Sequence, residues 1–230
     1  MFKYIQKLTD LVFPQKCAGC GKISERVMCA GCMAEITQLS MQYCARCRAP
    51  PYLCGCKKIE NIKELIFPYF YYGEKLKFAV YKLKKSNLYY INEFFAKSMY
   101  YSLEESDKIE FEEIDFIACV PRARKSFNIY GYNQAEKLAK LIAGYSGIKF
   151  KRALKPAGNQ QEQKTLSQSE RFLNVRDKFI INKKIDINNE NIIIIDDVVT
   201  TGATLSECAK VLKAAGANEI YALCAASTWN

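Results

Sequence analysis

One run of residues constrains the fold of this chain more than any other feature, because it changes abruptly from apolar to acidic to small and polar. Four consecutive isoleucines occupy residues 192–195, and Asp196 and Asp197 follow directly. Four β-branched apolar residues in a row are typical of a parallel strand that is covered on both faces. The sequence therefore predicts a central strand that ends at an acidic pair, at the edge of the sheet where ligands bind in open α/β folds.

The residues after the acidic pair are suited to holding an anion. Gly202 permits a turn that other residues resist, and Thr200, Thr201 and Thr204 offer hydroxyl groups. A helix predicted over residues 203–215 would direct its positive amino-terminal end at the same loop. The spacing excludes a Walker-type loop. We expect a phosphate site here, and the simpler alternative is an ordinary strand–turn–helix with acidic residues at the helix start.

This segment is similar to the phosphoribosyl-pyrophosphate (PRPP) motif of the type I phosphoribosyltransferases. In that motif, four apolar residues precede two acidic residues, two variable residues and a Thr-Thr-Gly-x-Thr loop. The resemblance implies that Asp196 and Asp197 are the catalytic carboxylates and hold the ribose 2′- and 3′-hydroxyls. It further implies a Mg²⁺ ion with the PRPP and a wrapped 5′-phosphate. The implied PRPP-binding residues after the acidic pair are Val198, Thr200, Thr201, Gly202, Ala203 and Thr204.

Cysteines form the second strong signal. The chain has 11 cysteines, and most of them fall in two clusters near its start. Cysteines at such short spacings predict two tetrahedral zinc sites of four cysteines each, and the spacing leaves sequential and interleaved pairing of the ligands open. Disulfides and an iron–sulfur cluster are the alternatives. The predicted ligands are Cys17, Cys20, Cys29 and Cys32 in the first cluster, and Cys44, Cys47, Cys54 and Cys56 in the second.

The order of the predicted elements indicates an α/β fold. Strands are predicted over residues 114–120, 147–154, 192–195 and 219–225, and helices over residues 74–84, 88–103, 135–143 and 203–215. Alternating strands and helices predict a type I phosphoribosyltransferase-like parallel sheet flanked by helices. We expect three parts: a small zinc-ribbon module at residues 1–60, a helical and aromatic connecting segment at residues 61–112, and the phosphoribosyltransferase core at residues 113–230.

Two further segments carry a family resemblance over nearly the whole chain. After the strand at residues 114–120 come a Pro-Arg-Ala-Arg-Lys loop at residues 121–125 and a Gly-Tyr-Asn-Gln-Ala helix start at residues 131–135, and a Gln-Lys-Thr-Leu-Ser segment follows at residues 163–167. Together with the zinc ribbons, these segments resemble the ComF family of competence-associated phosphoribosyltransferase-like proteins. The family usually carries arginine where this chain has Tyr130, so Arg122, Arg124 and Lys125 are expected to meet the diphosphate.

The resemblance leaves two functions open. The first is a phosphoribosyltransferase that uses Mg²⁺-PRPP in DNA uptake, with an unknown acceptor. The second is a non-catalytic adaptor that keeps PRPP as a structural or regulatory ligand and handles single-stranded DNA or a competence helicase. The chain contains no histidine, which removes the commonest general base.

Charge and composition bear on partners and location. The formal net charge is +10, which favours anionic partners such as nucleic acid or phosphate. Tyr81 and Tyr89 are interleaved with Lys82, Lys84 and Lys85, a pattern that fits either a single-stranded-DNA surface or core tyrosines with solvated lysines. No apolar run reaches the ~18 residues of a membrane span. Reduced cysteines without a signal peptide predict a cytoplasmic protein.

Overall fold

The computed structural model describes residues 14–40, 59–70, 73–85, 88–106, 109–122, 131–157 and 178–227. The second cysteine cluster, Arg124, Lys125, Tyr130 and the segment at residues 163–167 lie outside the described residues. The predictions made for them are therefore carried forward as predictions.

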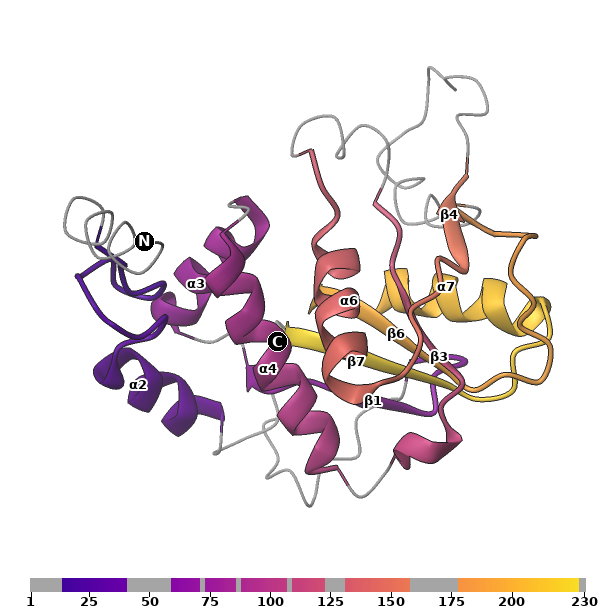
Figure 1. The fold of residues 1–230 in the computed structure, drawn as a ribbon, viewed down its shortest axis with the longest axis horizontal. Helices are drawn as coiled ribbons and strands as arrows, with labels where there is room; N and C mark the ends of the chain where they lie inside the picture. The colour runs from indigo at the N-terminus through magenta and orange to yellow at the C-terminus, as the bar shows by residue number, and fades with distance from the viewer. Residues whose placement is uncertain are drawn as a thin grey trace, which may run out of the picture.

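A parallel sheet with the isoleucine strand in its middle forms the centre of the molecule (Figure 1). The strand order is β1-β7-β6-β3, and β2 pairs with β7 further along the same strand. Every pairing in this sheet is parallel, which confirms the predicted α/β sheet. The strands are β1 (Glu64–Ile66), β2 (Tyr69–Phe70), β3 (Phe116–Cys119), β6 (Ile192–Val199) and β7 (Ile220–Ser227).

Helices cover both faces of the sheet, each face over its own core. On one face, Ile193 and Ile195 belong to a cluster with residues from four helices, and on the other face Ile192 and Ile194 pack with residues of a fifth helix. All four isoleucines are fully buried, as predicted for a strand covered on both faces. Helices α4 (Tyr89–Glu104) and α6 (Gln134–Ser146) pack on the first face, and α7 (Ala203–Ala214) covers the second (Figure 1). The first cluster extends from α4 to α3 (Glu74–Lys85) and on to α2 (Ala30–Ser40).

The segment that was expected to connect the two ends of the chain takes part in both the sheet and its covering layer. It supplies β1, β2, α3 and α4, and a short 3₁₀ helix, η2 (Phe111–Glu113), leads into β3. Tyr69 is buried, stacks on Phe94 with ring centroids 6.2 Å apart, and bonds through its hydroxyl to Ser98 Oγ at 2.8 Å. Tyr81 and Tyr89, in contrast, are 58% and 65% exposed. The aromatic residues of this segment are therefore divided between core and surface.

One predicted strand end is wrong. Pairing between β6 and β3 stops at Ile195, but pairing between β6 and β7 continues to Val199. The acidic pair therefore lies within β6, beside a strand on one side and at an open edge on the other. The ladder with β7 keeps the backbone extended past the point where the apolar run stops.

The strand predicted over residues 147–154 is also wrong. Only Phe150 pairs with β3, through a single parallel bridge to Ile117. The Ala153 N–H then bonds to the carbonyl of Lys151 at 3.0 Å, and this local bond turns the chain away from the sheet. A separate antiparallel pair follows, formed by β4 (Leu154–Pro156) and β5 (Phe179–Ile181).

The zinc-ribbon end carries α2 (Ala30–Ser40), which contacts α3 and β2. Within the part of the chain that the structure describes, no helix combines the length and the apolar character needed to cross a membrane.

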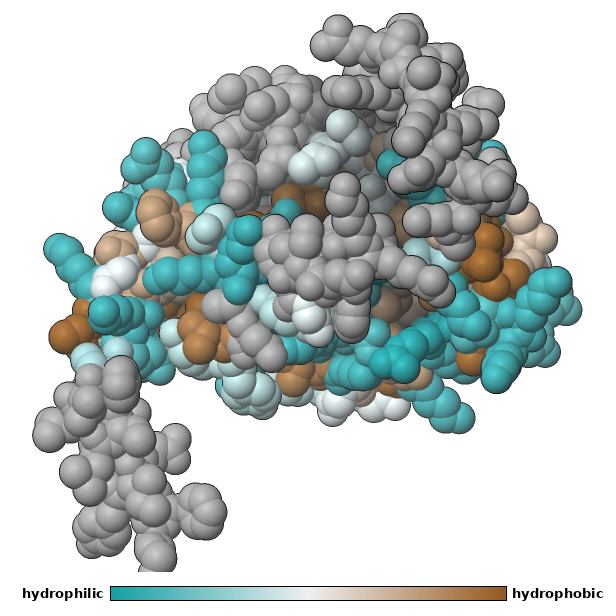
Figure 2. Space-filling model, turned by 90° about the horizontal axis from the view of Figure 1, so that it is seen from above, coloured by the Kyte–Doolittle hydropathy of each residue, from teal (hydrophilic) through white to brown (hydrophobic). Residues whose placement is uncertain are grey.

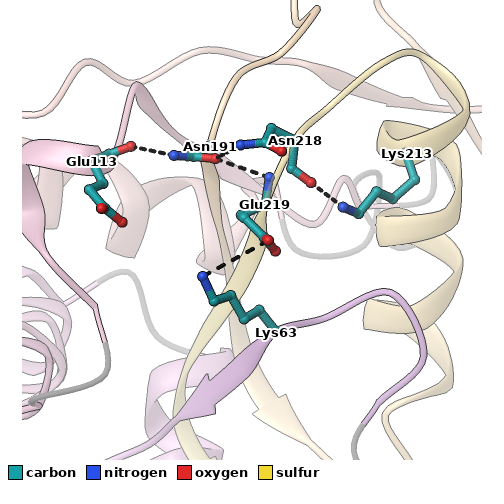
Figure 3. Close-up of polar contacts among 6 residues, drawn as sticks. All are labelled: Lys63, Glu113, Asn191, Lys213, Asn218 and Glu219. Carbon is teal, nitrogen blue, oxygen red and sulfur yellow. Dashed lines mark hydrogen bonds and ion pairs between the residues drawn. The ribbon is translucent and has the colours of Figure 1, made fainter.

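One asparagine ties together the segments at the amino-terminal edge of β6 (Figure 3). Asn191 Nδ2 donates to the carbonyl of Glu113 at 2.8 Å. Its Oδ1 accepts from Asn218 Nδ2 at 2.9 Å and from the Glu219 backbone N–H at 3.0 Å. This side chain thus joins the approach to β3, β6 and β7 at the edge of the sheet opposite to the acidic pair.

We expect Asn191→Ala to lower the free energy of unfolding by about 1–3 kcal/mol, because three hydrogen bonds are lost and the Glu219 N–H loses its partner. Asn218→Ala removes one of the same bonds and should have a smaller effect. Urea unfolding of both variants measures the difference. Equal stability of Asn191→Ala and the unsubstituted chain would show that water replaces these bonds without loss.

Candidate functional site

The loop after β6 leads into α7 through a left-handed glycine. Gly202 has φ +76°, a conformation that favours glycine, and it stands directly before the first residue of α7. Gly202 has no side chain with which to cap the helix, and Thr201 Oγ1 accepts from the N–H of Ala203 at 3.3 Å. Thr200, Thr201, Ala203 and Thr204 are exposed around this helix start. The N–H groups and hydroxyls that were predicted to hold a phosphate are therefore gathered at one helix amino terminus.

The two carboxylates lie directly before this loop, and both are half-buried. The Asp197 N–H donates to Asp196 Oδ1 at 2.8 Å, and the Val198 N–H donates to Asp197 Oδ1 at 2.7 Å. Consecutive strand residues point to opposite faces, so the pair offers carboxyl oxygens on both sides of the end of β6. The backbone fixes both side chains at the mouth of the loop.

Burial raises the pKa of Asp196 to about 8, and the adjacent charge of Asp197 adds to the shift. The Asp197 N–H and the ammonium of Lys84 oppose it. Asp196 therefore keeps its proton to a higher pH than an exposed aspartate does. A protonated carboxyl both donates and accepts hydrogen bonds, which suits it to a sugar hydroxyl.

Lys84 lies at the acidic pair, although the sequence alone did not indicate it as a residue of this site. Its Nζ lies 3.7 Å from Asp197 Oδ1, so the last turn of α3 reaches the acidic pair. In the sequence, Lys84 belonged to an aromatic and basic pattern that was weighed as a DNA surface. The contact spans more than a hundred residues of chain, and no local spacing signals it.

Side chains of the helix-start motif at residues 131–135 bond to backbone carbonyls elsewhere in the chain. Asn133 Nδ2 donates to the carbonyl of Val120 at 3.0 Å, and Gln134 Nε2 donates to the carbonyl of Leu83. Arg122, the described member of the predicted diphosphate set, is half-buried and donates through Nη1 to the carbonyl of Tyr132 at 3.0 Å. The motif therefore joins the end of β3, the start of α6 and the end of α3 beside the acidic pair.

The first cysteine cluster forms a four-thiol centre. The Sγ atoms of Cys17, Cys20, Cys29 and Cys32 all lie within 4.8 Å of one another. Cys20 Sγ and Cys29 Sγ are 3.9 Å apart, close to the roughly 3.8 Å expected between sulfurs that share a tetrahedral zinc ion. This grouping follows the sequential pairing for the first cluster. The thiols fit a structural zinc ion.

Backbone donors favour the thiolate form of one of these four cysteines, Cys17. Burial alone would raise the pKa of Cys17, but N–H groups of Cys29, Cys20 and Gly19 lower it to about 6. The Cys29 N–H lies 3.3 Å from Cys17 Sγ. A thiolate is the form that binds metal. All cysteines of the described residues are free, and Cys119, Cys208 and Cys224 are buried in the core away from this centre.

The parallel sheet and the acidic pair before the β6–α7 loop are features of the phosphoribosyltransferase class, and comparison with known families gives the same class. Residues 86–228 match the phosphoribosyl transferase domain family, and residues 8–60 match the double zinc ribbon domain. The first match covers more than half of the chain, and the chain belongs to the phosphoribosyl transferase domain family. The four-thiol centre lies within the second match, which together with its geometry indicates zinc.

Two curated relatives are competence proteins, which confirms the resemblance to the ComF family. The chain is 26% identical over 213 residues to Competence protein F of Haemophilus influenzae, covering 89% of this chain and 92% of the relative. It is 26% identical over 209 residues to Competence protein ComFC of Streptococcus pneumoniae, covering 89% and 84%. A solved structure of the allosteric regulatory enzyme of purine biosynthesis is more distant, with 19% identity, a TM-score of 0.42, and coverage of 63% of this chain and 30% of that one.

Asp196 should destabilise the fold at neutral and alkaline pH. Its folded pKa is raised from 3.8 to about 8, so its favourable contribution is complete below about pH 4 and is lost as the pH rises through about 8. We expect Asp196→Asn to raise the free energy of unfolding at pH 8 by about 1–3 kcal/mol, and by less at pH 5. Urea unfolding at both pH values measures this. Asp186→Asn, at an exposed carboxylate, is the control, and an Asp196→Asn chain that is less stable at pH 8 would contradict the expectation.

Removal of one thiol ligand should remove one metal ion. We expect Cys32→Ser to lower the zinc content by about one equivalent per chain and to unfold the first ribbon, because structural zinc supplies the folding energy of such modules. Elemental analysis and hydrogen exchange of residues 14–40 measure these effects. Cys208→Ala, which changes a buried cysteine of α7, should keep its zinc. Unchanged zinc content in Cys32→Ser would show that Cys32 is not a ligand.

Proposed function

We propose that this chain binds PRPP with Mg²⁺ at the β6–α7 loop and transfers the phosphoribosyl group to an acceptor during DNA uptake. The observation that carries the proposal is the acidic pair set directly before a helix start with a left-handed glycine and exposed threonines. Asp196 and Asp197 hold the ribose 2′- and 3′-hydroxyls in this proposal. The loop from Thr200 to Thr204 holds the 5′-phosphate with its N–H groups and hydroxyls. The family match at residues 86–228 supports the same ligand.

The reaction exchanges one bond at C1 of the ribose. The bond from C1 to the diphosphate oxygen breaks, and its electron pair leaves with the diphosphate. A lone pair of the acceptor forms the new bond to C1, and the acceptor's proton passes to solvent or to the departing oxygens. Positive charge develops on the sugar ring, where the carboxylates stabilise it. Mg²⁺, when it is bound with PRPP, supplies a Lewis acid for the leaving group.

The cysteines support proposals for the number of zinc ions and for the cellular location of the protein. We propose two structural zinc ions, one in each predicted cluster, in keeping with the double zinc ribbon match. Free thiols throughout the described chain favour a reducing compartment, and we place the protein in the cytoplasm. The competence relatives support a role in natural transformation.

The second candidate function is a non-catalytic adaptor that binds single-stranded DNA or a competence helicase and keeps PRPP as a regulatory ligand. The exposed side of α3 favours it. Phe78 is 60% exposed and Tyr81 is 58% exposed, and Lys85 Nζ lies 5.9 Å from the Tyr81 ring centroid. Figure 2 shows apolar and hydrophilic residues intermingled at the end of the molecule that carries α3 in Figure 1. Aromatic rings beside lysines are a stacking surface for unpaired bases.

Calorimetric titration with PRPP and Mg²⁺ tests ligand binding. We expect the variant with both Asp196→Asn and Asp197→Asn to bind PRPP at least about a hundredfold more weakly, because charge-assisted bonds to the ribose are lost. Asp186→Asn, which alters an exposed carboxylate away from the loop, should bind as the unsubstituted chain does. Equal affinity of the double variant would overturn the site.

Release of pyrophosphate separates the two functions. The assay is run with the zinc-loaded chain alone, with pooled small metabolites, and with single-stranded DNA. Release that depends on one addition and disappears in the double variant supports a transferase and identifies its class of acceptor. Tight PRPP binding without release under any condition, together with salt-sensitive DNA binding, supports the adaptor.

A further inference from the structure

Lys84 brings a positive charge to the acidic pair from outside the matched family domain. Its Nζ lies 3.7 Å from Asp197 Oδ1, and it precedes residue 86, where the match begins. The side chains of Lys84 and Asp197 are 42% and 20% exposed. An ion pair this exposed contributes little to stability. A structural role therefore does not account for the placement of this lysine at the mouth of the loop.

The last turn of α3, which carries Lys84, is held by the start of α6. The Tyr132 hydroxyl lies 3.3 Å from the carbonyl of Lys84, and Gln134 Nε2 donates to the carbonyl of Leu83. Carbonyl groups at the end of a helix have no partner within the helix, so these donors satisfy them and fix the turn. The fold therefore sets the backbone position from which the Lys84 side chain reaches Asp197.

The neighbours of Lys84 place it on the β3 side of the site. Tyr132 bonds to Lys84 through its hydroxyl and accepts at its carbonyl from Arg122 Nη1 at 3.0 Å. Arg122 belongs to the loop after β3, whereas the proposed 5′-phosphate loop follows β6. Lys84 and Arg122 thus bring two positive charges to the β3 side of the site.

We propose that Lys84 is a ligand-binding residue whose ammonium group contacts the diphosphate of PRPP, while the ribose hydroxyls bond to Asp197. This inference rests on the proposed function. The Asp197 carboxylate repels a highly charged anion, and a lysine within ion-pair distance of that carboxylate offsets the repulsion. On binding, the ammonium exchanges one carboxylate partner for a phosphate partner of higher charge.

Three variants test the assignment by calorimetric titration with PRPP and Mg²⁺. We expect Lys84→Met to weaken binding about 10- to 100-fold, the range of one charge-assisted hydrogen bond. Lys84→Arg keeps the charge and should stay within about threefold. Lys77→Met makes the same charge change at an exposed position of the same helix and should leave the affinity unchanged. Thermal unfolding monitored by circular dichroism verifies that each variant is folded.

Two fragments of the ligand identify which group Lys84 contacts. Inorganic pyrophosphate with Mg²⁺ should lose affinity for Lys84→Met, and ribose 5-phosphate should not. The reverse pattern, or an unchanged affinity of Lys84→Met for PRPP, would overturn the assignment while leaving PRPP binding by the unsubstituted chain intact. An unsubstituted chain that binds no PRPP would contradict the proposed function and the Lys84 contact with it.

Discussion

The burial of β6 on both faces is the constraint on which the rest of the molecule depends. Ile193 and Ile195 belong to the core in which α4 and α6 pack against one face of the sheet and α3 packs against α4, and Ile192 and Ile194 pack with α7 on the other face. Because the strand is covered on both sides, its last residues emerge at a fixed position between two packed layers. Asp196 lies at this position, directly after the buried isoleucines, and its raised pKa results from the burial that anchors the strand.

Helix α3 links the zinc ribbon to the acidic pair. Lys82 Nζ donates to the carbonyl of Cys17 at 3.0 Å, and two residues later Lys84 meets Asp197. Residues two apart on a helix point about 200° away from each other, so one turn contacts the metal ribbon and the site from different sides. The ribbon's folding depends on its metal. The first ribbon is therefore bonded to the same helix that carries Lys84.

The sequence was most informative where chemistry is encoded locally. The isoleucine run, the loop at Gly202 and the thiol set of the first ribbon each lie in one short segment. The structure shows a strand buried on both faces, a left-handed glycine before a helix, and four thiols brought together. The end of β6 was misjudged at Ile195, because polarity changes there while the ladder with β7 continues to Val199. The strand over residues 147–154 failed for the opposite reason, since apolar residues were present but Phe150 alone found a partner in the sheet.

Long-range contacts account for what periodicity did not reveal. Asn133 and Gln134 carry amides that suggest ligand binding in a motif, yet they bond to the carbonyls of Val120 and Leu83. Lys84 is the opposite case, because its spacing in the sequence is that of an ordinary solvated lysine, whereas the structure places it at the acidic pair. The amides hold the end of α3 in place, and that placement gives Lys84 its role. Motif residues can thus act through the element they position, and the residue that meets the ligand then lies outside the motif.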